Sequence, residues 1–350
     1  MPKIVFLPGA YDGCYYYRGY LPAIYGGMTP GMMFSDRWDK EKLAEKAMDA
    51  DIVVFQRPND KTRVELGRLL KRRGKKIVYE NDDTYLPDVG VPLNMLGSDK
   101  QREIAIELNK NLYEFIGLAD MVIASTEFLA DEYRALHSNV KVLKNCIDPH
   151  DEHKRGPRGD KFRIGFIGSV TSNLDYEHIK DTLRTLAKRG DVTLVALGFK
   201  RNPKYMAGFE EDAAFWDSLP NVEWHEFVPV MEYMHKIASL NLDLALIPRH
   251  NSYFNRCKSN IKFLELSLLR IPIIAQGFTT NDSPYQNVYD AKHMQVLVND
   301  EDWLPTVENT MKNYQQYATL ADKAHDYVLK NYNIKKYAPK WREAIETLCN

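Results

Sequence analysis

The feature that most constrains the fold is the alternation of short apolar runs with longer amphipathic segments along the 350 residues. Short runs rich in Val, Ile and Phe are typical of buried strands, and helical periodicity between them is typical of crossover helices. This order predicts parallel sheets with helices on both faces. The chain is too long for one ordinary domain. The sequence therefore predicts an α/β chain of two Rossmann-like, doubly wound domains facing a central cleft, with ligands at the carboxyl ends of the strands.

The predicted elements fall into two series. In the first half, strands are predicted at Lys3–Leu7, Asp51–Phe55, Lys76–Tyr79, Met121–Ala124 and Val140–Leu143, and helices at Thr62–Arg73, Lys100–Leu118 and Glu127–Leu136. In the second half, strands are predicted at Phe162–Ile167, Val192–Ala196, Val222–Trp224, Leu242–Ile247, Ile271–Ala275 and Gln295–Val298, and helices at Glu177–Arg189, Met231–Ser239 and Lys258–Leu269. The last fifty residues have a mostly helical pattern.

The predicted domain boundary is the polar segment Asp148–Lys161, which contains almost no apolar residues. Charged residues, glycine and proline without hydrophobic periodicity are typical of a linker between domains. The predicted organisation is an N-terminal domain at 1–150, a linker at 151–161, a C-terminal domain at 162–330 and a terminal helical segment at 331–350.

The composition excludes several classes of protein. Hydrophobic residues make up 44% and charged residues 27%, and the net charge of −1 gives no global attraction to nucleic acid or anionic lipid. No apolar run approaches the ~20 residues that span a bilayer. The opening residues predict a strand rather than a targeting leader. The four scattered cysteines lack metal-type spacing, which indicates reduced thiols and a cytoplasmic location.

The segment Pro248–Pro272 contains the strongest candidates for ligand binding. On the predicted helix, Lys258, Lys262 and Glu265 stand at positions i, i+4 and i+7 and share one face. Cations near a helix start suit the phosphates of a nucleotide diphosphate, and a carboxylate suits both hydroxyls of its ribose. Arg249, just after the preceding strand, is a further candidate cation. The spacing alone leaves a solvated stripe with an ordinary Lys–Glu pair as the alternative.

A second phosphate-binding candidate lies where the C-terminal domain begins. Gly168 and Ser169 follow the predicted strand Phe162–Ile167 and precede a helix, so their backbone can approach phosphates closely. Such turns occur in Rossmann-like domains generally, so this turn by itself is weak evidence for phosphate binding. It adds to the evidence from the segment that contains Lys258 and Lys262.

The loop after the first predicted strand, Pro8–Pro22, holds candidates in the N-terminal domain. Gly9 and Gly13 follow the strand, and the residues Tyr15, Tyr16, Tyr17 and Arg18 are predicted to begin a helix. The G-x-G-x-x-G pattern of dinucleotide-binding proteins is absent. Aromatic packing beside a helix-capping glycine is the structural alternative.

Paired carboxylates, Asp82 and Asp83, follow another predicted strand, Lys76–Tyr79. Two acids at a strand end can bind a metal, act as a base or accept hydrogen bonds from sugar hydroxyls. Capping of the next segment is the alternative. Arg57, after the strand Asp51–Phe55, is a further candidate at the same edge.

Taken in order, these segments resemble the family-4-like GT-B glycosyltransferases, in particular their bacterial and phage branch. The stretch Asn255–Glu265, followed by Ile271–Ala275, is similar to the branch's N-x-x-K-S-x-x-K-x-x-E and G-x-P-V-I-A pattern. The loop Pro8–Pro22 is similar to its acceptor-side G-G-C-G-x-Y-R-x-x-x-P loop, and Tyr79–Asp83 is similar to its Y-E-x-D-D run. The chain departs from the family at Cys257, where better-known members carry a second glutamate that contacts the transferred sugar.

The resemblance implies the GT-B architecture and transfer of a sugar from a nucleotide-sugar donor with retention of configuration. It implies donor binding by Gly168, Ser169, Arg249, Lys258, Lys262 and Glu265, acceptor binding by Gly13, Tyr17 and Arg57, and catalytic roles for Asp82, Asp83 and Arg18. It implies no metal and no cofactor besides the nucleotide sugar, because helix dipole and cations neutralise the leaving diphosphate. The terminal segment 331–350 is implied to return to the N-terminal domain, with Trp341 and Ile345 as its packing face.

The usual acceptor in this branch is a polysaccharide or a lipid-linked glycan, and the latter allows peripheral contact with a membrane. The rival acceptor is a modified base in DNA, as in phage enzymes, which needs a basic face made from Lys71–Lys76 and Lys154–Arg163. A solvated helix end is the structural interpretation of the first basic run. Cys257 favours a third alternative, a GT-B protein that binds nucleotides without catalysis.

Overall fold

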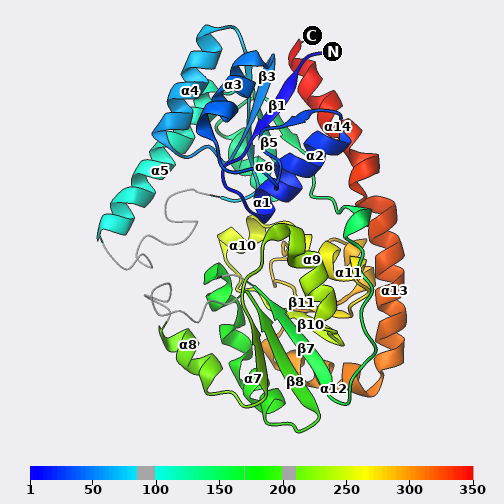
Figure 1. Cartoon of the computed structure of the whole chain (residues 1–350). Helices are drawn as coiled ribbons and strands as arrows, with labels where there is room; N and C mark the ends of the chain where they lie inside the picture. The colour runs from blue at the N-terminus through cyan, green and yellow to red at the C-terminus, as the bar shows by residue number, and fades with distance from the viewer. Residues whose placement is uncertain (85–98, 169, 199–209, 350) are drawn as a thin grey trace. The chain divides into compact units, whose positions relative to one another are not determined.

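The computed structural model describes residues 1–84, 99–168, 170–198 and 210–349. They form two compact units (Figure 1). Unit 1 contains Met1–Asp148, Cys257–Ser259 and Tyr332–Asn350, and unit 2 contains Pro149–Arg256 and Asn260–Asn331. Each unit has its own six-stranded sheet. Every neighbouring strand pair in both sheets is parallel, which confirms the predicted fold class of two Rossmann-like units. The predicted linker 151–161 lies within unit 2.

The sheet of unit 1 has the strand order β2-β1-β3-β4-β5-β6. Its strands are β1 (Ile4–Leu7), β2 (Thr29–Pro30), β3 (Ile52–Gln56), β4 (Lys76–Asn81), β5 (Met121–Ala124) and β6 (Val140–Val142). The chain adds β2 on one side of β1 and all later strands on the other. The order therefore reverses between β1 and β3, and their carboxyl ends form the switch point where ligands bind in such sheets.

Helices cover both faces of this sheet (Figure 1). They are α1 (Gly13–Tyr15), a π-helix (Tyr16–Tyr20), α2 (Leu21–Tyr25), α3 (Lys40–Asp49), α4 (Lys61–Arg72), α5 (Asp99–Leu118), α6 (Glu127–Arg134), α14 (Ile334–Glu346) and a closing 3₁₀ turn (Thr347–Cys349). On one face, Trp341 and Ile345 of α14 are buried against β1, as predicted. On the other, the Phe115 ring of α5 lies 4.8 Å from that of Phe55. Burial on both faces explains the continuous apolar strands.

The sheet of unit 2 has the order β12-β11-β10-β7-β8-β9. Its strands are β7 (Phe162–Ile167), β8 (Val192–Leu197), β9 (Val222–His225), β10 (Leu244–Ile247), β11 (Ile273–Gln276) and β12 (Gln295–Leu297). Its α-helices are α7 (Lys180–Ala187), α8 (Glu210–Asp217), α9 (Val230–Ser239), α10 (Tyr253–Cys257), α11 (Ile261–Leu268), α12 (Trp303–Lys312) and α13 (Tyr314–Asn331). Its 3₁₀ turns are Pro149–Asp151, Val170–Ile179, Asp290–His293 and Asp300–Asp302. The switch point lies between β7 and β10.

The predicted helix Lys258–Leu269 is wrong at its start. The structure has two helices, α10 and α11, separated by the non-helical residues 258–260. Polar side chains in the break bond outside the helix: Asn145 Nδ2 donates to Ser259 Oγ at 2.7 Å, and Asn260 Nδ2 donates to Asp290 Oδ2 at 2.7 Å. Such side-chain bonds compete with helical backbone bonds. The shared helical face therefore holds for Lys262 and Glu265 but not for Lys258.

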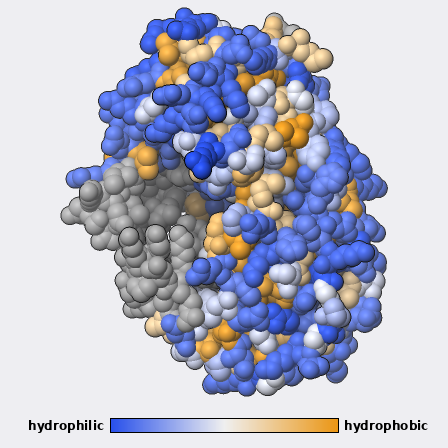
Figure 2. Space-filling model, in the orientation of Figure 1, coloured by the Kyte–Doolittle hydropathy of each residue, from blue (hydrophilic) through white to orange (hydrophobic). Residues whose placement is uncertain are grey.

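One face of the molecule shows how its apolar patches are distributed. On the face shown in Figure 2, hydrophilic residues dominate and apolar residues gather in small separate groups. Among the described helices, none is both long and apolar enough to cross a bilayer.

Candidate functional site

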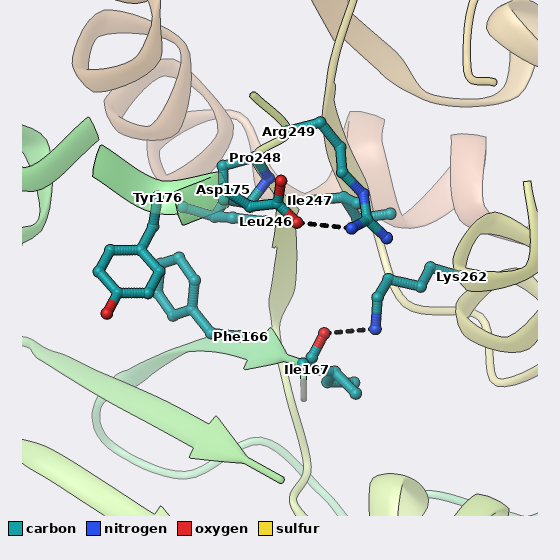
Figure 3. A pocket seen from close by; sticks show the side chains of 10 residues that line it. Phe166, Ile167, Asp175, Tyr176, Leu246, Ile247, Pro248, Arg249 and Lys262 are labelled. Atoms are coloured by element: carbon teal, nitrogen blue, oxygen red, sulfur yellow. Dashed lines mark hydrogen bonds and ion pairs between the residues drawn. The ribbon is translucent and has the colours of Figure 1, made fainter. Parts of the chain in front are cut away.

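The switch point of unit 2 holds a small cavity of about 20 Å³ (Figure 3). Its lining combines the end of β7 with the loop after β10 and the start of α11. Gly168 and Arg249 belong to the two loops, and Lys262 belongs to the helix. The carboxyl ends of two strands that diverge in chain order leave space for a ligand in this class of sheet. Three of the predicted donor-site residues, Gly168, Arg249 and Lys262, thus lie together at this switch point.

Lys262 brings a cation to the end of β7. Its Nζ donates to the backbone carbonyl of Ile167 (Figure 3). Lys262 and Gly168, the residue after Ile167, line the same cavity. Lys262 also stands in the first turn of α11, where the unpaired backbone N–H groups carry partial positive charge. A cation and a helix start together make a site for an anion such as a diphosphate.

Glu265 is buried one turn further along α11. Only 5% of the residue is exposed, which excludes the solvated stripe for this side chain. Its Oε2 lies 3.4 Å from the Tyr233 hydroxyl of α9, which donates to it. Burial and the negative charge of Glu265 raise the pKa of Tyr233 well above its usual range, so the phenol keeps its proton. The carboxylate thus accepts a hydrogen bond from Tyr233 and stands one turn along α11 from Lys262, which lines the cavity.

Arg249 is tied to a carboxylate that the sequence did not single out. Its NH1 lies 2.5 Å from Asp175 Oδ2, and both side chains are almost fully buried. The other oxygen of Asp175 accepts from the His250 backbone at 3.1 Å and from Asn255 Nδ2 at 2.7 Å. Asp175 thus neutralises Arg249 and fixes the loop after β10. Arg249 shapes the site, and Lys262 supplies its charge.

Two further residues of this site escaped the sequence patterns. Asp175 is one of 48 acidic residues and stands in no recognisable motif. Tyr233 lies on a correctly predicted helix, but helical periodicity does not show which side chain faces Glu265. Ser169, predicted to contact phosphate, lies outside the described residues.

Gly198 keeps the phosphate-binding turn in place. It follows β8 with φ +90°, and a Cβ at this position would lie 2.2 Å from the carbonyl oxygen of Gly168. The backbone of Gly168 in turn donates to Leu197 O at 3.1 Å. Only glycine combines this backbone conformation with such close approach.

Gly198→Ala is expected to destabilise unit 2 by about 1–3 kcal/mol, because the turn at Gly168 must move to make room for the methyl group. The same movement is expected to lower the affinity for any ligand that binds at this turn. Urea unfolding and ligand titration measure the two effects. Gly190→Ala is the matched control, since a Cβ there meets nothing within 4 Å. Equal stabilities of the two variants would contradict the assigned role of Gly198.

The switch point of unit 1 brings loop backbones equally close. Gln56 Oε1 accepts from the backbone N–H of Gly9 at 2.9 Å, and a Cβ on Gly9 would lie 2.4 Å from the Gln56 carbonyl. Arg57 follows with φ +52°, in the left-handed region. Such conformations in non-glycine residues concentrate at functional sites.

Arg57 organises the paired carboxylates. Its NH2 lies 2.5 Å from Asp83 Oδ2 and its Nε lies 3.6 Å from Asp82 Oδ1. Its NH1 donates to Cys14 Sγ at 3.1 Å. Lys258, whose short segment belongs to unit 1, also pairs with Asp83. Asp83 is therefore balanced by two cations, and Asp82 is the acid with the weaker ion pair.

The surroundings of the paired carboxylates are cationic. Within the described ranges, no group of three or more His, Cys, Asp or Glu side chains is placed to hold an ion. Asp83 pairs with Arg57 and Lys258, and Asp82 lies 3.6 Å from Arg57 Nε.

Arg18 is a buried structural cation rather than the catalytic residue predicted. Its side chain is 0% exposed, and its Nε donates to Glu80 Oε1 at 2.6 Å. Its NH1 donates to Leu143 O and, at 3.1 Å, to Asn145 Oδ1. The guanidinium also lies 4.7 Å from the centre of the Trp341 ring. No part of the group reaches the surface to meet a substrate.

The two other acceptor-side candidates differ in exposure. Tyr17 is 7% exposed and its ring packs edge-on against Tyr16, with centroids 5.1 Å apart. Gly13 begins α1, and a Cβ there would meet nothing within 4 Å. Tyr17 is therefore part of the aromatic packing, which was the structural alternative to acceptor binding. The space next to the Gly13 Cα is open.

The first basic run, Lys71–Lys76, lies at the end of α4 and the amino end of β4. Lys71 and Lys76 lie 2.8 and 3.7 Å from Asp120. The run is thus at the edge of the sheet opposite the switch point, and part of its charge is neutralised.

The second basic segment, Lys154–Arg163, precedes or begins β7 at the amino edge of the sheet of unit 2. Arg158 lies 2.5 Å from Asp243, and Arg163 lies 2.9 Å from Glu223. These cations anchor the segment to its own unit. In both units the basic segments and the candidate site lie at opposite edges of the sheet.

No protein-family model and no curated protein sequence matches the chain. Solved structures do match. HepE from Anabaena, in complex with UDP and glucose, has a TM-score of 0.68 and 14% identity, covering 99% of this chain and 100% of that chain. An alpha-glucosyltransferase in complex with UDP-glucose and DNA containing an abasic site has a TM-score of 0.66 and 12% identity, and the match covers 98% of each chain. A glycosyltransferase from Rickettsia africae has a TM-score of 0.66 and 13% identity, and the match covers 99% of this chain and 98% of that chain. Likeness at these identities shows the fold, the GT-B architecture predicted from the sequence.

Proposed function

We propose that this chain is a glycosyltransferase that takes a sugar from a nucleotide-sugar donor bound by unit 2. The observation that carries the proposal is the pair of Lys262 and buried Glu265, one turn apart on α11 beside the switch point. A cation for phosphate and a carboxylate for ribose are the two groups that a nucleoside diphosphate needs. The similar structures of HepE and of the alpha-glucosyltransferase contain UDP or UDP-glucose, which supports the same donor class here.

The leaving diphosphate sets the electrostatic task of the site. In this proposal Lys262 and the N-terminus of α11 stabilise the charge that develops as the bond from sugar to phosphate breaks. Glu265 accepts hydrogen bonds from the ribose hydroxyls. Arg249 and Lys258 each face a carboxylate, so they orient loops rather than carry the phosphate charge. We propose that the reaction needs no metal, because lysine and helix dipole supply the positive charge.

Transfer is proposed to retain the configuration at the sugar. The acceptor hydroxyl forms its bond to the sugar on the face from which the diphosphate departs. The departing phosphate oxygen takes the proton of that hydroxyl, so no covalent nucleophile is assigned. Asp82 is the acid best suited to orient the acceptor, because Asp83 is already balanced by Arg57 and Lys258.

A glycan is proposed as acceptor in preference to DNA. Duplex DNA binding depends on cations that contact phosphates. Both basic segments of this chain lie at the amino edges of the sheets and are partly neutralised by Asp120, Asp243 and Glu223. The four free cysteines fit a reducing compartment, so we propose a cytoplasmic location.

One nucleoside diphosphate among UDP, GDP, ADP and CDP is expected to raise the melting temperature of the protein by roughly 5–10 °C at about 100 Kd. Lys262→Met is expected to abolish the shift, because the diphosphate loses its cation. Lys188→Met, an exposed lysine of the same unit, is the matched control and is expected to keep it.

Release of free sugar from the matching nucleotide sugar then separates an enzyme from a protein that only binds nucleotides. A melting temperature unchanged by all four nucleotides would contradict the proposed donor class. An unchanged shift in Lys262→Met would contradict the assignment of the phosphate site.

A further inference from the structure

A cluster of aromatic rings lies at the carboxyl edge of the sheet of unit 1. Phe34, in the loop after β2, is its centre, and Tyr11, in the loop after β1, lies 4.6 Å from it. The rings of Tyr20 and Tyr16 meet Phe34 edge-on at 5.2 and 5.8 Å. β1 and β2 are neighbouring strands, and β1 borders the switch point. The rings therefore stand beside the loop of Gly9 and Gly13, on the proposed acceptor side.

The outermost ring is exposed but rigidly held. Tyr11 is 39% exposed, although its ring packs on Phe34 and its hydroxyl donates to Met33 O at 2.5 Å. Tyr16, by contrast, is 4% exposed and belongs to the core. An exposed aromatic ring fixed by packing and by a hydrogen bond loses little entropy when a ligand stacks on it.

Carboxylates border this ring. Asp12 follows Tyr11 in the chain, and Asp36 stands two residues after Phe34. Partial burial and the negative charge of Asp36 raise the pKa of the Tyr11 hydroxyl. One oxygen of each acid caps local backbone: Asp12 Oδ1 accepts from Tyr15 N, and Asp36 Oδ2 accepts from Met33 N, both at 3.1 Å. Within the part of the chain that the structure describes, the second oxygen of each makes no hydrogen bond.

We infer that Tyr11 and Phe34 form a stacking platform for a sugar ring of a neutral glycan acceptor. A pyranose has an apolar C–H face that suits an aromatic ring and a rim of hydroxyls that suits carboxylate acceptors, the mix of groups typical of small-ligand sites. Two neighbouring carboxylates repel the phosphates of a nucleic acid, which favours the glycan over a stacked base. This inference rests on the proposed function, since it names the acceptor of that reaction.

The experiment measures binding of maltopentaose, isomaltopentaose and chitopentaose to the whole chain by saturation-transfer NMR, with and without UDP. At least one of the three is expected to bind. Tyr11→Ala is expected to weaken that binding by about tenfold or more, and Tyr11→Phe to preserve it, because the ring and not the hydroxyl makes the contact. Trp38→Ala is the control, since Trp38 is equally exposed but makes no ring contact with the described residues.

Several outcomes would overturn the platform: no binding by any of the three sugars, equal loss in Trp38→Ala, or binding of a twelve-residue oligothymidylate that Tyr11→Ala removes. An unchanged melting temperature of Tyr11→Ala excludes unfolding as the cause of a loss. If the sugar binds through Tyr11 while no nucleotide stabilises the wild-type chain, the platform stands and the proposed transferase activity fails.

Discussion

Arg18→Met is expected to lower the free energy of unfolding of unit 1 by about 3–5 kcal/mol at pH 8, the usual cost of removing one partner of a buried ion pair. The substitution leaves Glu80, itself 0% exposed, without the cation 2.6 Å away. It also leaves Asn145 Oδ1 and the Leu143 carbonyl without their donor. Hydrogen exchange of peptides from β1 and β4 reports the opening of this unit separately from unit 2.

The double variant Arg18→Met with Glu80→Met tests the cause of that loss. Replacing both charges by apolar groups removes the unpaired carboxylate, so most of the lost stability is expected to return. An additive loss in the double variant would show that packing against Trp341, and not charge, sets the cost.

The pH dependence of the loss follows from the state of Glu80. Burial raises the pKa of Glu80 to about 7, from an ordinary value of 4.5. The carboxyl group of Glu80 thus binds its proton more tightly in the folded chain than in the unfolded chain. The contribution of this proton to the free energy of unfolding is lost as pH rises through 7. The cost of Arg18→Met is therefore expected to be smaller at pH 5, where Glu80 is neutral, than at pH 8.

Glu265→Gln is expected to reduce kcat/KM for the nucleotide-sugar donor by about 10²–10³-fold, the effect of weakening two charge-assisted hydrogen bonds to the ribose. Glutamine keeps the size of the side chain and an acceptor for Tyr233. The change therefore removes charge with little effect on packing.

Calorimetric titration with the stabilising nucleoside diphosphate and with its dideoxyribose analogue locates the effect. The wild-type chain is expected to prefer the ribose form, and Glu265→Gln to bind both forms equally weakly. Glu232→Gln, an exposed acid on α9, is the control. Wild-type preference for ribose in Glu265→Gln would place the ribose contact elsewhere.

The site was predictable to the extent that it depends on neighbours in the sequence. Lys262 and Glu265 lie on one helix, so their spacing in the sequence predicts that they share a face. Lys258 did not follow, because the helix breaks at Ser259 and Asn260, whose partners Asn145 and Asp290 are remote in sequence. Tyr11 matches no position of a recognisable motif, whereas Tyr17 in the same loop does.

By itself the sequence determined the two parallel sheets, because a strand covered on both faces must be apolar along its whole length, and that requirement is written into each local run. Only the tertiary structure decided which charges remain available to a ligand. Arg18 meets Glu80 across 62 positions, and Arg249 meets Asp175 across 74. Ion pairing depends on distance in space, so no local pattern distinguishes a cation neutralised in the interior from one that faces a substrate.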